Sequence, residues 1–208
     1  IDEVLDSCKF GPGTSVGVSG DSTNFFSKLK GEWTVTPTCI PYATAALGRA
    51  NGVWSLLGLE RDGVRCVDPE GFSAAVQARC VWKEQHDEVM MVPKNAKTHR
   101  FIGKPKTLDG YVQLGAGEVI SRRLRRFGVD LRSQGRNQEL ARAGSTSDGF
   151  VPFLGNWSTI DLEMASDTLS TEVVRLLLPP EWFSFLCRLR SPTYKLVDFP
   201  DMGVLNYH

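Results

Sequence analysis

Two carboxylates in the last quarter of the chain, Asp161 and Asp167, have a spacing that metal-dependent phosphoryl transfer could use. Residues 157–161 alternate like a strand, so Asp161 would end that strand on the same side as Thr159, where its carboxylate can project into a cleft. Mg²⁺ prefers hard oxygen ligands, and two such ions can stabilise the attacking and the leaving oxygen of a phosphoryl transfer. A purely structural role also fits, with Asp161 ending a strand and Asp167 capping a helix.

Three cations, Lys94, Lys97 and Arg100, follow Pro93 at intervals of three residues. In an extended segment that leads into a turn, they could converge on a triphosphate or on the backbone of RNA. The alternative is a solvated loop whose charges bind nothing.

These cations open a strongly basic window, residues 94–142, in which twelve lysines and arginines face four acidic residues, a net charge of +8. The chain as a whole is neutral, with 24 basic and 24 acidic residues, so the rest of it carries the compensating negative charge. Such a block is typical of a surface that binds a polyanion such as RNA, DNA or a nucleoside triphosphate. A solvated helix face is the alternative interpretation.

Other kinds of chemistry lack their sequence signals. The sequence contains no G-K-[ST] phosphate loop and no G-x-S-x-G nucleophile. Its five cysteines include no C-x-x-C pair, which argues against a disulfide framework and a zinc ribbon and favours a reducing compartment. No apolar run approaches the ~18 residues of a membrane helix, and no signal segment opens the chain. We therefore expect a cytosolic protein that contacts no membrane.

The elements that would position these residues are helices and strands in mixed order, which predicts an α+β fold. Gly, Ser and Thr in residues 1–36 favour loop with short strands, and 135–150 reads as a connection. Gly128 would end one of the helices, and Pro180 fits the first turn of another. The expected helices cover 43–47, 71–82, 117–127, 169–177 and a segment from Pro180 onward, and the expected strands cover 89–92 and 157–161.

Both ends of the chain look cut. The first residue is Ile1 rather than Met, and the alternation in residues 204–208 stops abruptly, as in a strand separated from its partner. We expect a fragment of a longer protein.

Several segments, in the same order, resemble one family. The carrying residues are Val92-Pro93-Lys94-x-Ala96-Lys97-x-x-Arg100, the stretch from Gly117 to Gly128, and Ser158-Thr159-Ile160-Asp161-Leu162-x-x-Ala165-Ser166-Asp167. Phe10-Gly11-Pro12-Gly13, Thr36-Pro37 and Leu178-Pro179-Pro180-Glu181 continue the match. From about residue 10 to its last residue, the chain resembles the RNA-directed RNA polymerase of leviviruses, the single-stranded RNA bacteriophages.

The resemblance implies a right-hand polymerase, with fingers over residues 1–156 and an incomplete palm over 157–208. Asp161 would be the catalytic metal-binding aspartate, with Leu162 beside it as a second Mg²⁺ ligand, and Asp167 would sit near the 2′-hydroxyl of the incoming nucleotide. Lys94, Lys97 and Arg100 would line the path of the triphosphates. The residues expected near RNA are Arg122, Arg123, Arg125 and Arg126.

The family's later palm motifs, Met-Gly-Asn and Gly-Asp-Asp, are absent from the sequence. We therefore expect the fragment to be inactive, with template RNA and nucleoside triphosphates as ligands of the longer protein. By resemblance, its partners would be host elongation factors Tu and Ts and ribosomal protein S1, in the cytoplasm of the infected bacterial host. The alternative is a non-catalytic RNA-binding module that uses the basic window 94–142.

Overall fold

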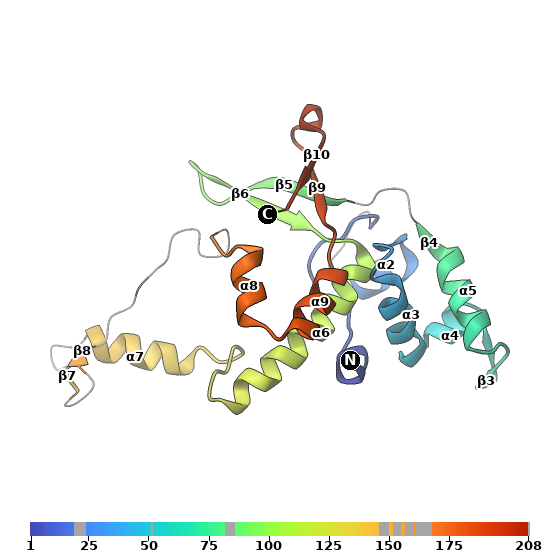
Figure 1. Cartoon of the computed structure of the whole chain (residues 1–208), viewed down its shortest axis with the longest axis horizontal. Helices are drawn as coiled ribbons and strands as arrows, with labels where there is room; N and C mark the ends of the chain where they lie inside the picture. Colours follow the sequence, from blue (N-terminus) through green and yellow to red (C-terminus); the bar gives the residue numbers. More distant parts are fainter. Residues whose placement is uncertain are drawn as a thin grey trace. The chain divides into compact units, whose positions relative to one another are not determined.

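The computed structural model describes residues 1–18, 24–50, 52–81, 86–145, 150–151, 155–156, 160 and 168–207. The chain divides into two compact units, Ile1–Val119 with Leu178–His208, and Ile120–Leu177. The division falls inside one long helix, α6 (Thr107–Arg126). Helices and strands alternate irregularly along the chain (Figure 1), which confirms the α+β class.

The first unit holds most of the regular structure. Its helices besides the first part of α6 are α1 (Asp2–Leu5), α2 (Phe25–Lys30), α3 (Ile40–Arg49), α4 (Val53–Leu56), α5 (Pro69–Arg79), α9 (Pro180–Arg188) and the 3₁₀ helix η1 (Pro200–Met202). Its strands are β1 (Trp33–Thr34), β2 (Glu60–Arg61), β3 (Val64–Arg65), β4 (Cys80–Val81), β5 (Asp87–Pro93), β6 (His99–Lys104), β9 (Thr193–Leu196) and β10 (Val204–Asn206).

A four-stranded sheet in the order β10-β9-β5-β6 joins distant parts of the sequence. β5 and β6 form an antiparallel hairpin, β5 pairs with β9 in parallel, and β9 pairs with β10 in antiparallel register. The expectation that the last strand lacks its partner is therefore wrong, because Val204 pairs with Lys195 inside the chain. The sheet combines strands from both sides of residue 156, and the boundary between fingers and palm stays a prediction.

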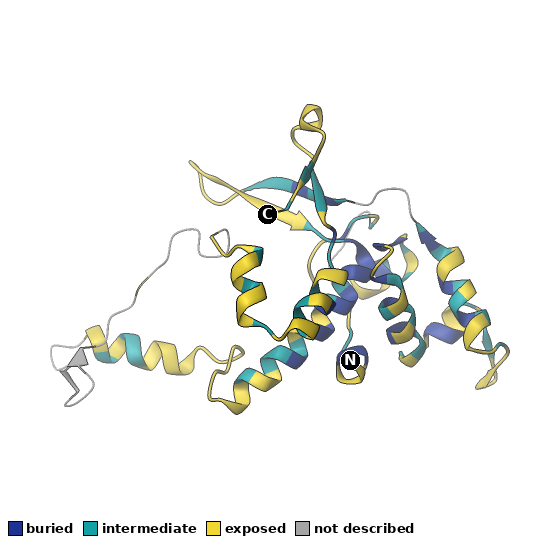
Figure 2. Cartoon of the chain, in the orientation of Figure 1, coloured by how far each residue is buried: buried dark blue, intermediate teal, exposed yellow. Residues whose placement is uncertain are grey.

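The core of the first unit lies among α3, α5, α6 and α9, where the buried residues concentrate (Figure 2). Trp33, Leu47, Leu108 and Val112 are fully buried there. The rings of Trp54 and Phe72 stack with centroids 4.2 Å apart. Burying side chains of this size is worth roughly 1.5–3 kcal/mol each, so this cluster supplies much of the unit's stability.

The helix predictions hold best where caps are visible in the sequence. α5 begins where the Asp68 side chain accepts a hydrogen bond from the Gly71 amide at 2.8 Å and Pro69 occupies the first turn. Gly128, with φ +84°, follows the end of α6 as predicted. The expected helix from Pro180 is α9, and the expected strand 89–92 lies within β5.

Several expected bounds were wrong. The expected helix 71–82 is α5, which ends at Arg79 because Cys80 and Val81 form β4. Residues 1–36, expected as loop with short strands, contain the helices α1 and α2, and the expected helix 43–47 is the longer α3. The expected helix 117–127 begins ten residues earlier, because Gly110, Gly115 and Gly117 obscure a helical period that buries Leu108, Val112 and Val119. Residues 135–150, expected as a connection, contain the helix α7 (Gly135–Ser145).

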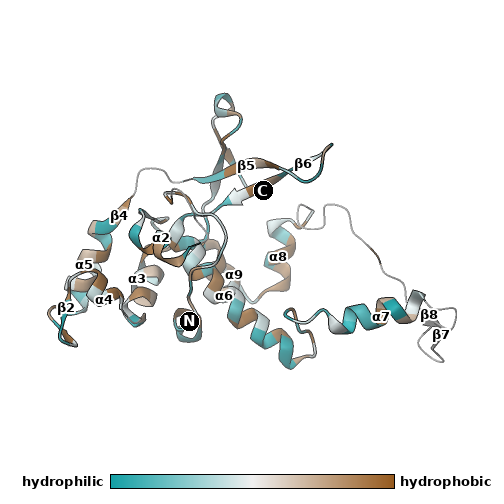
Figure 3. Ribbon diagram, turned by 180° about the vertical axis from the view of Figure 1, so that it is seen from behind, coloured by the Kyte–Doolittle hydropathy of each residue, from teal (hydrophilic) through white to brown (hydrophobic). Residues whose placement is uncertain are grey.

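The second unit contains the end of α6, α7, β7 (Phe150–Val151), β8 (Gly155–Asn156) and α8 (Thr171–Leu177). Among the residues of this unit whose burial the structure describes, 120–145, 160 and 168–177, none is buried. α7 is mostly hydrophilic (Figure 3), whereas Leu176 and Leu177 on α8 are 76% and 75% exposed.

Candidate functional site

The predicted metal site lies outside the described residues. Asp161, Leu162 and Asp167, together with the expected strand 157–161 except for Ile160, belong to the part of the chain that the structure does not describe. In the described ranges, no group of three or more His, Cys, Asp or Glu residues is placed to hold a metal ion. The metal and ribose roles of these three residues therefore stay predictions.

The predicted phosphate-binding cations Lys94, Lys97 and Arg100 lie together at the tip of the β5–β6 hairpin. Six residue pairs join the two strands, from Glu88 opposite Lys104 to Pro93 opposite His99. All three cations are exposed. The expectation of an extended segment leading into a turn is therefore confirmed, whereas their ligand stays a prediction.

One side chain organises the tip of this hairpin. The carboxamide Oδ1 of Asn95 accepts hydrogen bonds from the backbone amides of Lys97 and Thr98 and from the Thr98 hydroxyl, each at 2.9 Å. The Lys94 amide donates to the Thr98 carbonyl at 2.8 Å, which closes the turn. Because these backbone groups are satisfied within the loop, the cationic side chains extend from a defined scaffold.

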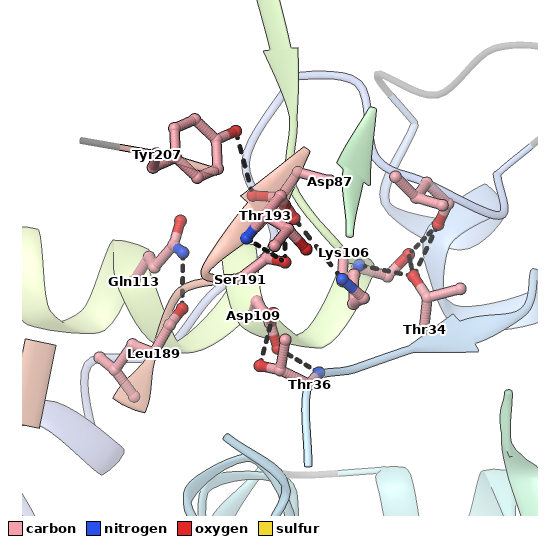
Figure 4. Close-up of polar contacts among 12 residues, drawn as sticks. Thr34, Thr36, Asp87, Lys106, Asp109, Gln113, Leu189, Ser191, Thr193 and Tyr207 are labelled. Atoms are coloured by element: carbon pink, nitrogen blue, oxygen red, sulfur yellow. Dashed lines mark hydrogen bonds and ion pairs between the residues drawn. The ribbon is translucent and has the colours of Figure 1, made fainter. Parts of the chain in front are cut away.

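A buried polar cluster holds the base of the hairpin (Figure 4). Lys106, which follows β6 and is 1% exposed, has its Nζ 3.7 Å from Oδ1 of Asp87, the first residue of β5. The Tyr207 hydroxyl donates to the other carboxylate oxygen of Asp87 at 3.5 Å. Burial raises the pKa of Asp87, and the nearby Lys106 opposes that rise. The pair joins both ends of the hairpin and the last strand of the sheet.

A second buried carboxylate, Asp109, stands at the start of α6. It accepts hydrogen bonds from the Thr36 amide at 2.9 Å and the Thr36 hydroxyl at 2.8 Å (Figure 4). Burial raises its pKa to about 6, although the two bonds from Thr36 lower it. Asp109 thereby ties α6 to the segment after β1, which is a structural role.

The burial of these clusters changes which charges of the basic window 94–142 can form an exposed surface. Lys106 and Asp109 count among its charges, yet both are buried and cannot contribute to an exposed surface. The sequence signal for Asp109 is its helical spacing with Val112, Ala116 and Val119, which places it on the apolar face. Asp87 and Lys106 carry no such signal, because only the pairing of β5 with β6 brings them together.

The predicted RNA-binding arginines, Arg122, Arg123, Arg125 and Arg126, all belong to the C-terminal turns of α6 and are exposed. Cations at a helix C-terminus also complement the negative end of the helix dipole, so part of their role is structural. Phe127, which follows the last residue of α6, is 86% exposed. The structure therefore groups these arginines on one exposed helix end, and their ligand stays a prediction.

A polar cleft of about 770 Å³ in the first unit is a third place where a ligand could bind. Among its charged lining residues, Lys104 pairs with Glu88 at 3.4 Å, and Arg79 donates to the Leu29 carbonyl at 2.7 Å. None of the predicted site residues is among those that line it.

Two further predicted segments have structural roles. The turn Phe10-Gly11-Pro12-Gly13 is held by Lys28, whose buried ammonium donates to the carbonyls of Gly11 and Gly13. Thr36, of the matched pair Thr36-Pro37, is the partner of Asp109. These hydrogen bonds stabilise the fold of the first unit. None of the helices in the described ranges is long and apolar enough to cross a membrane.

Comparison with known proteins identifies the family. Residues 1–199 match the family described as RNA replicase, beta-chain. The chain is 34% identical over 194 residues to the RNA-directed RNA polymerase beta chain of Enterobacteria phage GA, covering 93% of this chain and 32% of the relative. It is 33% identical over 215 residues to the RNA-directed RNA polymerase subunit beta of Qbeta virus strain MX1, covering all of this chain and 30% of that relative.

A shorter match supports the same assignment. The RNA-directed RNA polymerase beta chain of Escherichia phage MS2 is 44% identical over 110 residues, covering 53% of this chain and 19% of the relative. The chain thus spans at most about a third of the length of these relatives. The resemblance read from its motifs is confirmed, and the chain belongs to the RNA replicase beta-chain family.

Proposed function

We propose that these 208 residues form part of a viral RNA-directed RNA polymerase, which adds nucleotides to an RNA 3′-end on an RNA template. The observation that carries the proposal is the family match over residues 1–199. The exposed cations of the β5–β6 hairpin and of the α6 end support it, because both polymerase substrates, RNA and nucleoside triphosphates, are polyanions.

In this proposal the chain contributes the fingers and the first part of the palm of a right-hand polymerase. The RNA 3′-oxygen attacks the α-phosphorus of the incoming nucleotide and pyrophosphate leaves, so the protein acts mainly by positioning and by neutralising charge. Lys94, Lys97 and Arg100 would neutralise phosphates on one side. The arginines at the end of α6 would hold RNA.

The palm motif supplies the metal ligands. Asp161 offers a hard carboxylate oxygen, which is the donor that Mg²⁺ prefers, and Leu162 beside it completes the ligand pair that we assign. When bound, Mg²⁺ would stabilise charge on the attacking and leaving oxygens. Asp167 would lie near the ribose of the incoming nucleotide and discriminate its 2′-hydroxyl.

We infer that these 208 residues do not catalyse RNA synthesis by themselves. A two-metal reaction needs a second set of carboxylates, and the sequence contains no Gly-Asp-Asp segment to supply them. We propose that the reaction requires the longer polymerase, acting in the cytoplasm of the infected host with elongation factors Tu and Ts and ribosomal protein S1.

A non-catalytic RNA-binding module is the second candidate, favoured by the exposed cations at the hairpin tip. The two candidates differ at Asp161, so the test replaces Asp161 by Asn in the complete polymerase. We expect template-directed synthesis to fall by at least about 100-fold while RNA affinity changes less than about twofold, because an Asn cannot replace the carboxylate at a metal. Asp201→Asn, at an exposed carboxylate of η1, is the control. Unchanged synthesis by Asp161→Asn would favour the binding module.

A further inference from the structure

The turn that joins β9 to β10 exposes an unusual number of large apolar side chains (Figures 1 and 2). All eight residues of this segment, the β9–β10 tip (residues 197–204), are exposed. Val197 is 46% exposed, Phe199 44%, Met202 56% and Val204 54%. Single exposed apolar residues are ordinary, but four of them within eight residues indicate a surface that contacts another part of a protein.

Hydrogen bonds hold the β9–β10 tip in a fixed conformation. At its start, the Val197 amide donates to the Val89 carbonyl at 2.9 Å, and the Met91 amide donates to a carboxylate oxygen of Asp198 at 2.7 Å. After η1, Gly203 leads the chain into β10 with φ +67°, a conformation that favours glycine. The apolar side chains therefore extend from a defined scaffold that is joined directly to β5.

The charge of this segment argues against RNA as its partner. Residues 196–206 contain two acidic residues, Asp198 and Asp201, and no lysine or arginine. A polyanion would gain no ion pair from this segment and would be repelled by its carboxylates. The exposed apolar side chains therefore fit an apolar surface of a polypeptide.

The size of the β9–β10 tip indicates where that polypeptide surface comes from. A stable interface between two separate proteins takes about 20–30 residues from each side, whereas the tip offers the eight residues 197–204. A groove in the same chain needs less area, because its contact with the tip does not pay the entropy cost of associating two molecules. The chain covers only 32% and 30% of two relatives, so about two thirds of a polymerase of that length lies outside these residues.

The neighbouring edge of the sheet favours the same interpretation. Among the described residues, β10 pairs only with β9, and its three residues carry no charge that would protect the free edge. Natural proteins cover, charge or bend the edges of their sheets, because unpaired backbone groups beside apolar side chains promote aggregation. An uncharged edge next to an exposed apolar turn is therefore a surface that a complete protein covers.

We propose that the β9–β10 tip packs into an apolar groove formed by a part of the longer polymerase outside these 208 residues, with Phe199 and Met202 buried in that groove. The inference rests on membership of the replicase family and on the length of the relatives, and it does not depend on the catalytic role proposed for Asp161. Because Val197 and Asp198 join the tip to β5, this contact would fix the orientation of the four-stranded sheet relative to that part of the polymerase.

The test measures maleimide labelling of the purified complete polymerase chain, with Phe199→Cys and Met202→Cys made separately and the labelled peptides identified by mass spectrometry. We expect each of these cysteines to react at least about 30-fold more slowly in the native than in the unfolded chain, because a covered thiol reacts only when its contact opens. Val64→Cys is the matched control, since Val64 is 66% exposed on the β2–β3 hairpin of the same unit and should react at close to the unfolded rate. Weaker protection than this at either tip position would overturn the inference.

Dilution identifies the origin of any protection. A groove in the same chain should protect both cysteines equally before and after about tenfold dilution, whereas protection that is lost on dilution would overturn the inference in favour of a second copy of the chain. Unprotected tip cysteines in a polymerase that still synthesises RNA would reject this inference and leave the proposed function standing. Protected tip cysteines in a chain that synthesises no RNA would support this inference and reject the proposed function.

Discussion

Replacing Asp109 by Asn should remove a pH dependence of folding that this buried carboxyl creates. Asp109 is fully buried, and burial raises its pKa from the ordinary 3.8 to about 6 despite the hydrogen bonds from Thr36. The folded chain therefore holds this proton more tightly than the unfolded chain does. Its contribution to stability is fully present below about pH 3.8 and is lost as the pH rises through about 6.

The magnitude follows from the same shift. A rise from 3.8 to about 6 corresponds to roughly 3 kcal/mol in total, since one pKa unit is about 1.4 kcal/mol. Between about pH 4.5 and about pH 7, linkage predicts that this group alone lowers the free energy of unfolding by about 2 kcal/mol. An Asn at position 109 does not titrate, and its carboxamide can still accept from the Thr36 amide and donate to the Thr36 hydroxyl.

The assay is urea unfolding of the wild type and of Asp109→Asn at these two pH values. The stability difference between the two proteins should change by about 2 kcal/mol, with the variant gaining relative to the wild type at the higher pH. Asp201→Asn, which removes an exposed carboxylate from η1, controls for the loss of one negative charge. Parallel pH profiles for the wild type and Asp109→Asn would refute the buried, proton-retaining carboxyl.

Two further outcomes test the packing of the first unit. Gly115→Ala should destabilise the chain by about 2 kcal/mol in thermal or urea unfolding, because its Cβ would lie 2.6 Å from the Val4 carbonyl oxygen. Gly117→Ala, in the same helix with nothing within 4 Å, should instead stabilise it by about 0.5–1 kcal/mol, and a similar loss at both sites would contradict the close approach of α1 to α6. In thiol labelling of the native chain, the two exposed cysteines, Cys66 and Cys187, should react well before the three others. Rapid labelling of a buried cysteine would show that the core opens.

The buried polar clusters position the β5–β6 hairpin, whose tip is exposed. The Asp87–Lys106 pair lies at its base, and the Thr36–Asp109 contacts tie the start of α6 to the segment after β1. Removing one partner of a buried ion pair typically costs about 3–5 kcal/mol, because the other charge is left buried and unpaired, so Asp87 and Lys106 depend on each other at the base of the hairpin.

The sequence by itself determined the features that depend on local chemistry. The order of the motifs identified the family, which the comparisons confirm. The stop at Gly128 and the proline at the start of α9 were predicted because capping depends on neighbouring residues only, whereas the cap at Asp68 was missed. The same local reading failed at the start of α6, where three glycines obscure a helical period that tertiary packing supports.

Only the tertiary structure decided which charged side chains of the basic window 94–142 are exposed to solvent. Lys97 and Lys106 are the same residue type nine positions apart, yet one stands at an exposed hairpin tip and the other is 1% exposed beside Asp87. Nor could local patterns pair β9 with β5, because that contact joins residues more than a hundred positions apart. Burial and strand pairing are set by long-range contacts, whereas spacing along the chain records only local geometry. The sequence therefore predicted a polyanion-binding region, and the fold removes the buried Lys106 from it. The cations of the hairpin tip, of the end of α6 and of residues 132–142 stay exposed, and their ligand stays a prediction.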